Sequence, residues 1–337
     1  LRPASAVEIR ALRQFLMHLR IERGLPVSAR GKSASPVDDL TEHYIHYLRT
    51  ECGLAKNSIL VYAPCVHDFL TYRLAKTGNL ALQTLDAETI QAFLMERIAH
   101  CSSEPARLVS VAIRSLLRFL FLRGEAPRDL SPAVPRVRTY RQAGVPTILS
   151  PEEVESVLSA TDLTTQRGRR DSAILLLLAR LGLRAGEIVL LELRDVQWRT
   201  GEILVRGKGC RLDHVPLLAD VGEGLALYLR EDRGTSISRR FFLRLMPPRI
   251  GLTGPCSIDH IVRLALARAG VRPRHRCVAH LFRYSLATRM IRHGASMAEI
   301  AEVLRHRSQS TTAIYAKVSF DALRTVARPW PVSGGAQ

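Results

Sequence analysis

The chain has 337 residues, more than one hydrophobic core usually serves, so two domains are expected. Lys and Arg number 49 against 31 Asp and Glu, which gives a net charge of +18 and a pI near 10.5. This excess favours nucleic acid as a partner, because each neutralised phosphate releases counterions; a generally basic surface is the alternative. The longest apolar run, Ala173 to Ala179, is too short to span a bilayer, so no membrane segment is expected.

The cysteines and the first residues bear on the compartment. The six cysteines include no C-x-x-C pair and no zinc-type spacing. The opening stretch LRPASAVEIRALRQFL has neither the apolar segment nor the cleavage site of a secretory signal. A reduced, cytoplasmic protein is therefore expected.

Residues 1–36 are expected to form an N-terminal extension with one short helix, about Ala6 to Arg23. From Pro36 onward, apolar residues recur at the spacing of amphipathic helices. The four apolar stripes are Leu40, Tyr44, Tyr47 and Leu48; Val66, Phe69, Leu70 and Arg73; Ile90, Phe93, Leu94 and Ile98; and Ile113, Leu116, Leu117 and Leu120. They predict a compact all-α domain over residues 37–124.

Local signals predict where these helices begin and end. Pro64 should start the second helix or kink it, because proline cannot donate a hydrogen bond to residue i−4. Asp86 can cap the third helix, and Gly124 should end the fourth, which is expected to span Ala106 to Arg123.

Residues 125–147 contain four prolines and four arginines. Because proline interrupts regular structure, the segment is predicted to be an extended, basic linker between two domains. Its arginines are candidate DNA contacts: Arg128, Arg136, Arg138 and Arg141.

A second domain is predicted over residues 148–330. Helix start and stop signals in it are Ser150 with Pro151 and Glu153, Gly182 after a buried helix over Asp171 to Leu181, and Ser296 with Glu299. Between these helices the strands EILVR and LDHVPL flank the turn GKGC, which predicts a β-hairpin. The chain is therefore expected to be mainly α, with a small antiparallel sheet in its second domain.

Five short segments of the second domain carry side chains that could take part in catalysis. They are LGLRAGEI with Arg184 and Glu187, RGKGCRLDHVPL with Lys208, HLFRYSLAT with His280 and Arg283, VLRHRS with His306, and STTAIYAKV with Tyr315. Each segment alone has an ordinary interpretation, such as a surface arginine, a solvated turn lysine or a half-buried tyrosine. Their conjunction, in this order on a strongly basic chain, is very improbable by chance.

The five segments resemble the conserved boxes of the tyrosine recombinase, or phage integrase, family, whose pattern is Arg, Lys, His-x-x-Arg, His or Trp, and Tyr. The resemblance covers roughly residues 37–320. It implies an all-α core-binding domain, a basic connection and a mixed α+β catalytic domain of the DNA breaking-rejoining type, which close as a clamp around duplex DNA. It also implies site-specific recombination at the bacterial nucleoid, serving a phage or transposon-like element.

The resemblance assigns the catalytic set Arg184, Lys208, His280, Arg283, His306 and Tyr315. Attack on a phosphodiester builds negative charge on its oxygens, and the planar forks of two arginines match that charge. No acidic cluster for Mg²⁺ accompanies the segments, so neither a metal nor a cofactor is expected. Guanidinium groups would stabilise the negative charge on the phosphate in place of a metal ion.

Tyr315 would form a 3′-phosphotyrosyl link, and with an ordinary pKa of about 10 it must lose its proton as it attacks. His280 is the candidate base, following the family's role for that position. Lys208, on a hairpin tip, would protonate the departing 5′ oxygen, and His306 would hydrogen-bond the phosphate. Two positions depart from the family pattern: Tyr284 where a second His is usual, and Arg305 where Gly usually precedes the fourth box's His.

The expected partners are double-stranded DNA with inverted half-sites and a homo-tetramer on synapsed DNA, with an accessory protein or partner recombinase as a further possibility. A tail helix, Phe320 to Ala327, would pack on a neighbouring protomer; folding onto its own domain is the alternative.

Two other functions stay open: a type IB topoisomerase or hairpin-forming resolvase with the same chemistry, and a catalytically idle DNA-binding relative. Relaxation of any supercoil would indicate the former, and absence of a covalent adduct the latter.

Overall fold

The computed structural model describes residues 35–99, 101–137, 147–207, 211–272, 278–306 and 312. The chain divides into two compact units, with a boundary between residues 141 and 142. The described residues 35–137 form the helical unit, and those from 147 to 312 form the C-terminal unit. The predicted extension helix, Ala6 to Arg23, lies outside the described residues.

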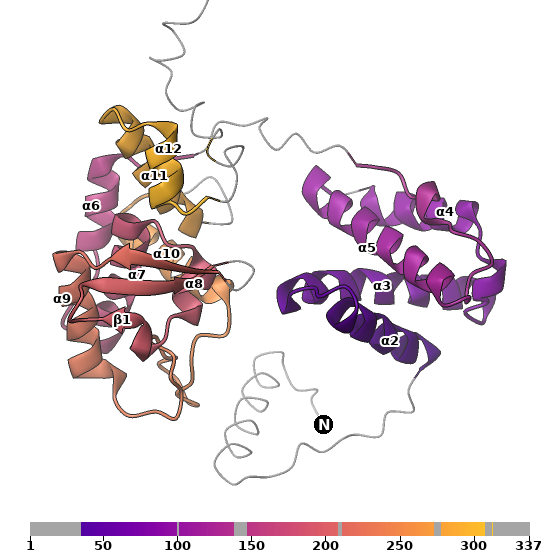
Figure 1. Ribbon diagram of the computed structural model, residues 1–337, viewed down its shortest axis with the longest axis horizontal. Coiled ribbons are helices and arrows are strands. Elements are labelled where there is room, and N and C mark those ends of the chain that lie inside the picture. The colour runs from indigo at the N-terminus through magenta and orange to yellow at the C-terminus, as the bar shows by residue number, and fades with distance from the viewer. Residues whose placement is uncertain are drawn as a thin grey trace, which may run out of the picture. The chain divides into compact units, whose positions relative to one another are not determined.

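The helical unit is built from α2 (Pro36–Thr50), α3 (Lys56–Thr77), α4 (Ala87–Ile98) and α5 (Ser103–Leu122), with short 3-10 turns at Leu82–Thr84 and Ser131–Ala133 (Figure 1). The predicted apolar stripes are the faces that these helices bury, so the all-α prediction is confirmed. The Asp86 carboxylate caps α4 by accepting from the Thr89 amide at 2.8 Å, and Gly124 follows α5 in the left-handed conformation.

The structure decides against one of the two alternatives for Pro64 and corrects the prediction for the linker. Pro64 lies inside α3 and does not start it, because the helix begins eight residues earlier at Lys56. The proposed linker is not extended from residue 125. Instead Ala126, Leu130 and Val134 are buried in the core of the helical unit, because their apolar side chains pack with those of the helices.

Arg73 is the one charged residue in the predicted stripes, and it is 4% exposed. Its guanidinium donates to the carbonyls of Leu80 and Ala81 and to the hydroxyls of Thr84 and Thr89. Burying a guanidinium is costly unless its donors are satisfied, and here they fasten the segment between α3 and α4 to the helices.

The C-terminal unit consists of α6 (Pro151–Ser159), α7 (Gln166–Leu181), α8 (Ala185–Leu190), β1 (Val196–Gln197), β2 (Glu202–Arg206), β3 (Leu212–Pro216), α9 (Ala219–Tyr228), α10 (Pro255–Arg268), α11 (Ala279–Arg292) and α12 (Met297–Val303). A single π-helical turn, Leu229–Arg233, extends α9. The strands form one antiparallel sheet in the order β1-β2-β3, with Ile203 opposite Val215. The mixed α+β prediction is confirmed.

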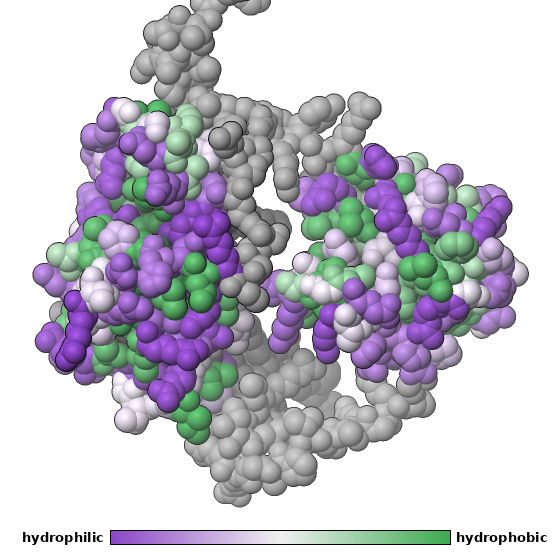
Figure 2. All heavy atoms as spheres, viewed as in Figure 1, coloured by the Kyte–Doolittle hydropathy of each residue, from purple (hydrophilic) through white to green (hydrophobic). Residues whose placement is uncertain are grey.

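Helix α7 is the centre of this unit, and ten of its residues are buried. It ends at Gly182, as the sequence predicted, but it begins five residues before the predicted Asp171, at Gln166 after the Thr165 cap. The capping boxes at Ser150 and Ser296 are also present. Hydrophilic side chains cover much of the face of this unit seen in Figure 2. Among the described residues, no helix is long and apolar enough to cross a membrane.

Candidate active site

Arg184 stands where the chain leaves α7. Gly182 has a φ of 57°, which favours glycine, and a Cβ there would lie 2.9 Å from the Leu304 side chain. The glycine therefore both turns the chain and lets the segment after α12 approach. Two residues later Arg184 precedes the first turn of α8, with its side chain 35% exposed.

The Glu187 carboxylate holds Arg184 in place. One oxygen, Oε2, accepts from the Arg184 amide at 2.9 Å, and the other, Oε1, accepts from its Nη1 at 2.6 Å. Glu187 is 5% exposed. Burial would raise the pKa of this carboxyl, but the charge of Arg305 and the hydrogen bonds from Arg184 outweigh burial and lower it. Glu187 is thus an ionised carboxylate at neutral pH.

Arg283 joins two separate segments of the chain. It lies on α11, is 3% exposed, and donates from Nη1 to the carbonyl of Gly182 and from Nη2 to that of Leu304. These carbonyls lie two residues before Arg184 and two residues before His306. One buried guanidinium therefore fixes the backbone on which two other predicted site residues stand.

His306 follows α12, and its Nδ1 lies 2.8 Å from the hydroxyl of Thr312. Burial, then the charges of Arg283, Arg184 and Arg305, lower the pKa of His306 from 6.5 to about 4. The imidazole is therefore neutral at physiological pH and offers a hydrogen bond without a charge.

His280 lies one turn before Arg283 on α11, and Asp259 of α10 caps the start of that helix by accepting from the Ala279 amide at 3.0 Å. The His280 side chain keeps solvent access, yet the protein atoms around it remove part of its hydration. This desolvation, with the charge of Arg283, lowers the pKa of His280. Its ring also stacks on that of Tyr284, at 6.1 Å between centroids.

Arg305 occupies a backbone conformation that glycine usually fills, with a φ of 53°. A non-glycine residue there costs on the order of 1–2 kcal/mol. Its side chain turns inward: Nη2 donates to Glu187 Oε2 at 3.0 Å, and the side chain is 6% exposed.

The structure brings together Arg184, His280, Arg283 and His306 of the predicted set. Lys208 and Tyr315 lie outside the described residues, as do Arg138 and Arg141. Arg128 and Arg136 are exposed in the helical unit. Sequence reasoning did not include Glu187 and Arg305 in the site. The three-residue spacing of Glu187 from Arg184 and the loss of the usual glycine at 305 were the available signals.

The base of the hairpin that carries position 208 is firmly held. Arg206, the last residue of β2, pairs with Asp195 through both Nη atoms, and Asp195 is fully buried. Arg206 also lies 3.7 Å from Glu192. The described part of the chain contains no group of three or more His, Cys, Asp or Glu side chains arranged to hold a metal ion.

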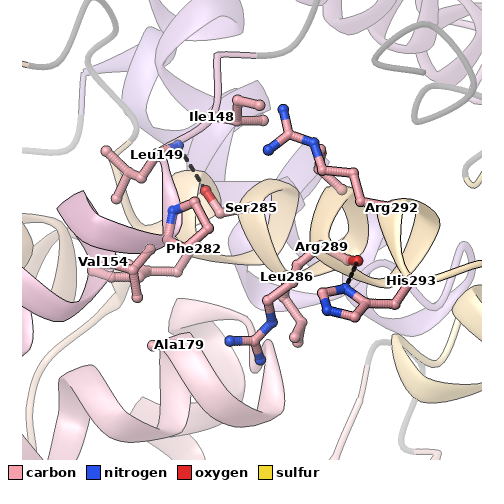
Figure 3. Close-up of a pocket in the computed structure, with 12 residues that line it drawn as sticks. Ile148, Leu149, Val154, Ala179, Phe282, Ser285, Leu286, Arg289, Arg292 and His293 are labelled. Atoms are coloured by element: carbon pink, nitrogen blue, oxygen red, sulfur yellow. Dashed lines mark hydrogen bonds between the residues drawn. The ribbon is translucent and has the colours of Figure 1, made fainter. Parts of the chain in front are cut away.

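An apolar pocket of about 170 Å³ lies on the other side of α11, between that helix and the segment leading into α6. Figure 3 shows Phe282 and Leu286 of α11 lining it together with Leu149 and Val154. The Ser285 hydroxyl accepts from the Leu149 amide at 2.7 Å, which fixes the start of the C-terminal unit against α11. The opposite side of the same helix carries Arg283.

Comparison with known proteins agrees with this arrangement. Residues 147–321 match the model of the phage integrase family, and residues 41–124 match its N-terminal SAM-like domain. The chain is 41% identical over 322 residues to the putative integrase/recombinase y4rA of Sinorhizobium fredii, covering 95% of this chain and 78% of that one. It is 30% identical to the tyrosine recombinase XerD of Listeria monocytogenes, covering 86% of this chain and 97% of the relative.

Solved structures share the fold at lower identity. A post-cleavage complex of the XerH site-specific recombinase with a palindromic difH substrate aligns with a TM-score of 0.66 at 20% identity, over 94% of each chain. A lambda integrase tetramer bound to a Holliday junction aligns with a TM-score of 0.60 at 15% identity, over 98% of this chain and 90% of that one.

A helical unit followed by an α+β unit is the fold that the chain shares with these solved recombinases. The matches over both units establish the family: the chain belongs to the phage integrase family of tyrosine recombinases, enzymes of site-specific DNA recombination.

Proposed function

We propose that this recombinase cleaves and rejoins duplex DNA through a 3′-phosphotyrosyl intermediate on Tyr315, in the service of a mobile element of bacterial DNA. One observation carries the proposal. The buried Arg283 guanidinium binds the carbonyls that precede Arg184 and His306, so that three of the six proposed catalytic side chains stand on one fixed framework.

The charges of this site suit a phosphodiester. Arg184 and Arg283 supply positive charge where the non-bridging oxygens become more negative during attack. His280 has a lowered pKa, so at neutral pH it is unprotonated and can accept the proton of the attacking tyrosine. His306, neutral for the same reason, donates a hydrogen bond to the phosphate.

The proposed nucleophile lies near this framework along the chain. Thr312 contacts the His306 ring, and three peptide units separate Thr312 from Tyr315. Chain length alone keeps the Cα atoms of these two residues within ~11 Å. The proton for the departing 5′ oxygen is assigned to Lys208, on the hairpin whose base Arg206 and Asp195 hold.

The proposal extends to the whole chain. Residues 37–124 would serve as the core-binding domain and 148–330 as the catalytic domain. The basic connection between them, with Arg128 and Arg136 exposed at its start, would follow the phosphate backbone. A tetramer on paired inverted sites is proposed because a lambda integrase of this fold is found as a tetramer on a Holliday junction.

Covalent capture tests the chemistry. A pool of nicked duplexes, randomised around the nick, would be incubated with the protein, and covalent adducts isolated under denaturing conditions. We expect an adduct in the presence of EDTA, with the 3′ phosphate on Tyr315, and none with Tyr315→Phe. An adduct on another residue, or one that persists in the Phe variant, contradicts the assignment.

The same reagents separate the related activities. Exchange between two copies of a recovered sequence indicates recombination, whereas relaxation of any supercoiled plasmid indicates a topoisomerase.

Deleting residues 319–337 should abolish pairing of two sites, measured by native gel shift, while binding to one half-site remains. Unchanged pairing would mean that the tail folds onto its own domain.

A further inference from the structure

Arg305 is a conspicuous position in the C-terminal unit. Among the described residues of that unit it is the one residue other than glycine with a positive φ. Glycine would adopt this backbone without strain. The chain nevertheless places there a long cationic side chain, which is directed into the protein and does not extend into solvent.

The Arg305 guanidinium forms a hydrogen bond within the candidate site. Its Nη2 donates to Glu187 Oε2 at 3.0 Å, the same oxygen that accepts from the Arg184 amide. Its Nη1 lies 3.4 Å from the Val303 carbonyl. Its buried Nε has no hydrogen-bond partner among the described residues. Among the described residues, the strong partner of this inward-directed side chain is therefore the carboxylate that also holds Arg184.

We propose that Arg305 is a positioning residue for strand cleavage, which acts through Glu187 to hold Arg184 toward the scissile phosphate and adds a positive charge behind it. This inference rests on the proposed function. With Arg305 in place, Glu187 Oε2 is satisfied from inside the protein, and Oε1 remains for the Arg184 side chain. Without Arg305, the two Glu187 oxygens would accept hydrogen bonds from the amide and the guanidinium of Arg184 alone.

The charge balance supports this role. Arg184, Arg283 and Arg305 carry three positive charges against one negative charge on Glu187, which leaves a charge of +2 among these four residues. A phosphodiester enters with a charge of −1 and approaches −2 as the tyrosine attacks. Removing Arg305 reduces the local charge to +1, which suits the ground state better than the transition state.

Three substitutions separate the charge from the backbone. Arg305→Gly relieves the positive φ, Arg305→Asn tolerates it without a charge, and Arg305→Lys keeps the charge without the fork. In single-turnover cleavage of the nicked duplex recovered above, we expect the Gly and Asn variants to be slower on the order of tenfold, and Lys to recover part of the rate. Half-site binding should stay within about twofold, because the side chain is buried away from DNA.

A double substitution tests the route through Glu187. If Arg305 acts through this carboxylate, Arg305→Gly combined with Glu187→Gln should cleave no more slowly than Glu187→Gln alone. Arg169→Ala is the matched control: it breaks a buried pair with Asp232, 13 residues before Gly182 along α7 and hence ~20 Å from it. This control should lower thermal stability and leave the cleavage rate of the folded protein unchanged.

Titration of His306 gives a readout that does not depend on activity. Arg305, Arg283 of α11 and Arg184 at the start of α8 all face this imidazole. Removing one of these charges should raise its pKa from about 4, as measured by NMR of the histidine ring protons. The acid limb of the cleavage rate should then move to higher pH.

His280 provides a second readout in the same titration. The charges that act on it come from Arg283, Arg184, Glu187 and Asp259 of α10, and not from Arg305. Since Arg184 and Glu187 act on this ring, a change of the His280 pKa in Arg305→Gly would report a changed placement of those two side chains. An unchanged His306 titration, or wild-type cleavage with an unchanged pH profile, overturns the inference. If the wild-type chain forms no adduct on any duplex, the proposed function fails, while the histidine titration still tests the placement of Arg305.

Discussion

Two buried arginines, one in each unit, use their guanidinium groups in the same way. Arg73 in the helical unit and Arg283 in the C-terminal unit are 4% and 3% exposed, and both donate to two backbone carbonyls. Arg73 fastens a connection between two helices. Arg283 fastens the two segments that carry Arg184 and His306.

The difference lies in what the fixed segments carry. The carbonyls held by Arg73 lead into a short turn with threonine hydroxyls, whereas those held by Arg283 lead to side chains of the candidate site. A buried arginine is thus a structural element in both units, and it becomes functional only through the residues next to its acceptors. Removal of either guanidinium breaks two buried hydrogen bonds to carbonyls, so function and stability can be separated by comparing the two positions.

The sharpest test of this comparison is to truncate both arginines. Each Ala variant removes buried hydrogen bonds to two backbone carbonyls, which costs about 2–5 kcal/mol of unfolding free energy. Arg283→Ala should also reduce cleavage on the order of 10²-fold or more, whereas Arg73→Ala should leave the rate per folded molecule unchanged. Calorimetry and single-turnover cleavage at low temperature measure the two effects. Equal cleavage losses in both variants would remove the distinction.

Arg184→Ala should affect cleavage more than stability, whereas Arg73→Ala should affect stability and leave cleavage unchanged. Its side chain is 35% exposed, and the buried Glu187 carboxylate with which it pairs keeps Arg305 as a donor, so Arg184→Ala should cost less thermal stability than Arg73→Ala. Cleavage should fall on the order of 10²-fold, because a donor to the developing charge is removed. Binding should persist, since other basic residues share the phosphate contacts. If gel shifts show binding and cleavage falling together, Arg184 is an ordinary phosphate anchor.

The arginines of the connection should affect binding alone. Replacing Arg128, Arg136, Arg138 and Arg141 with Ala should weaken binding to all sequences equally, because phosphate contacts carry no base information. The slope of log K against log salt should flatten by about 0.9 for each phosphate that is no longer neutralised, up to roughly 3 to 4 units. Fluorescence anisotropy across a salt series measures this slope. Weakening confined to one DNA sequence would instead indicate base recognition.

The smallest effect concerns pH. The pKa of His306 is lowered from 6.5 to about 4 in the folded protein, so the unfolded chain binds the proton more readily between these values. The contribution of His306 to stability is therefore present above pH 6.5 and is lost as pH falls toward 4. His306→Asn should lose less stability than wild type between pH 7.5 and 5, by roughly 2–4 °C in Tm once the partial exposure of the ring is allowed for. A larger loss of stability at acid pH in the variant than in wild type would contradict the lowered pKa of His306.

The periodic segments could be predicted because they depend on local chemistry. Helix α7 followed the run from Asp171 to Leu181 and its Gly182 stop, and strands β2 and β3 followed their alternating residues. The packed part of the connection could not be predicted in this way. Ala126, Leu130 and Val134 are apolar residues among prolines, and their burial depends on the surface that α5 offers.

The sequence by itself determined the family and the candidate residues of the site, because the box spacing and the caps are written in short contiguous stretches. Only the tertiary structure decided that Arg283 holds the carbonyls of Gly182 and Leu304, and that Arg305 reaches Glu187 across 118 positions of the chain. Such interactions join segments far apart in sequence. They depend on how the helices pack, and local propensity carries no information about that.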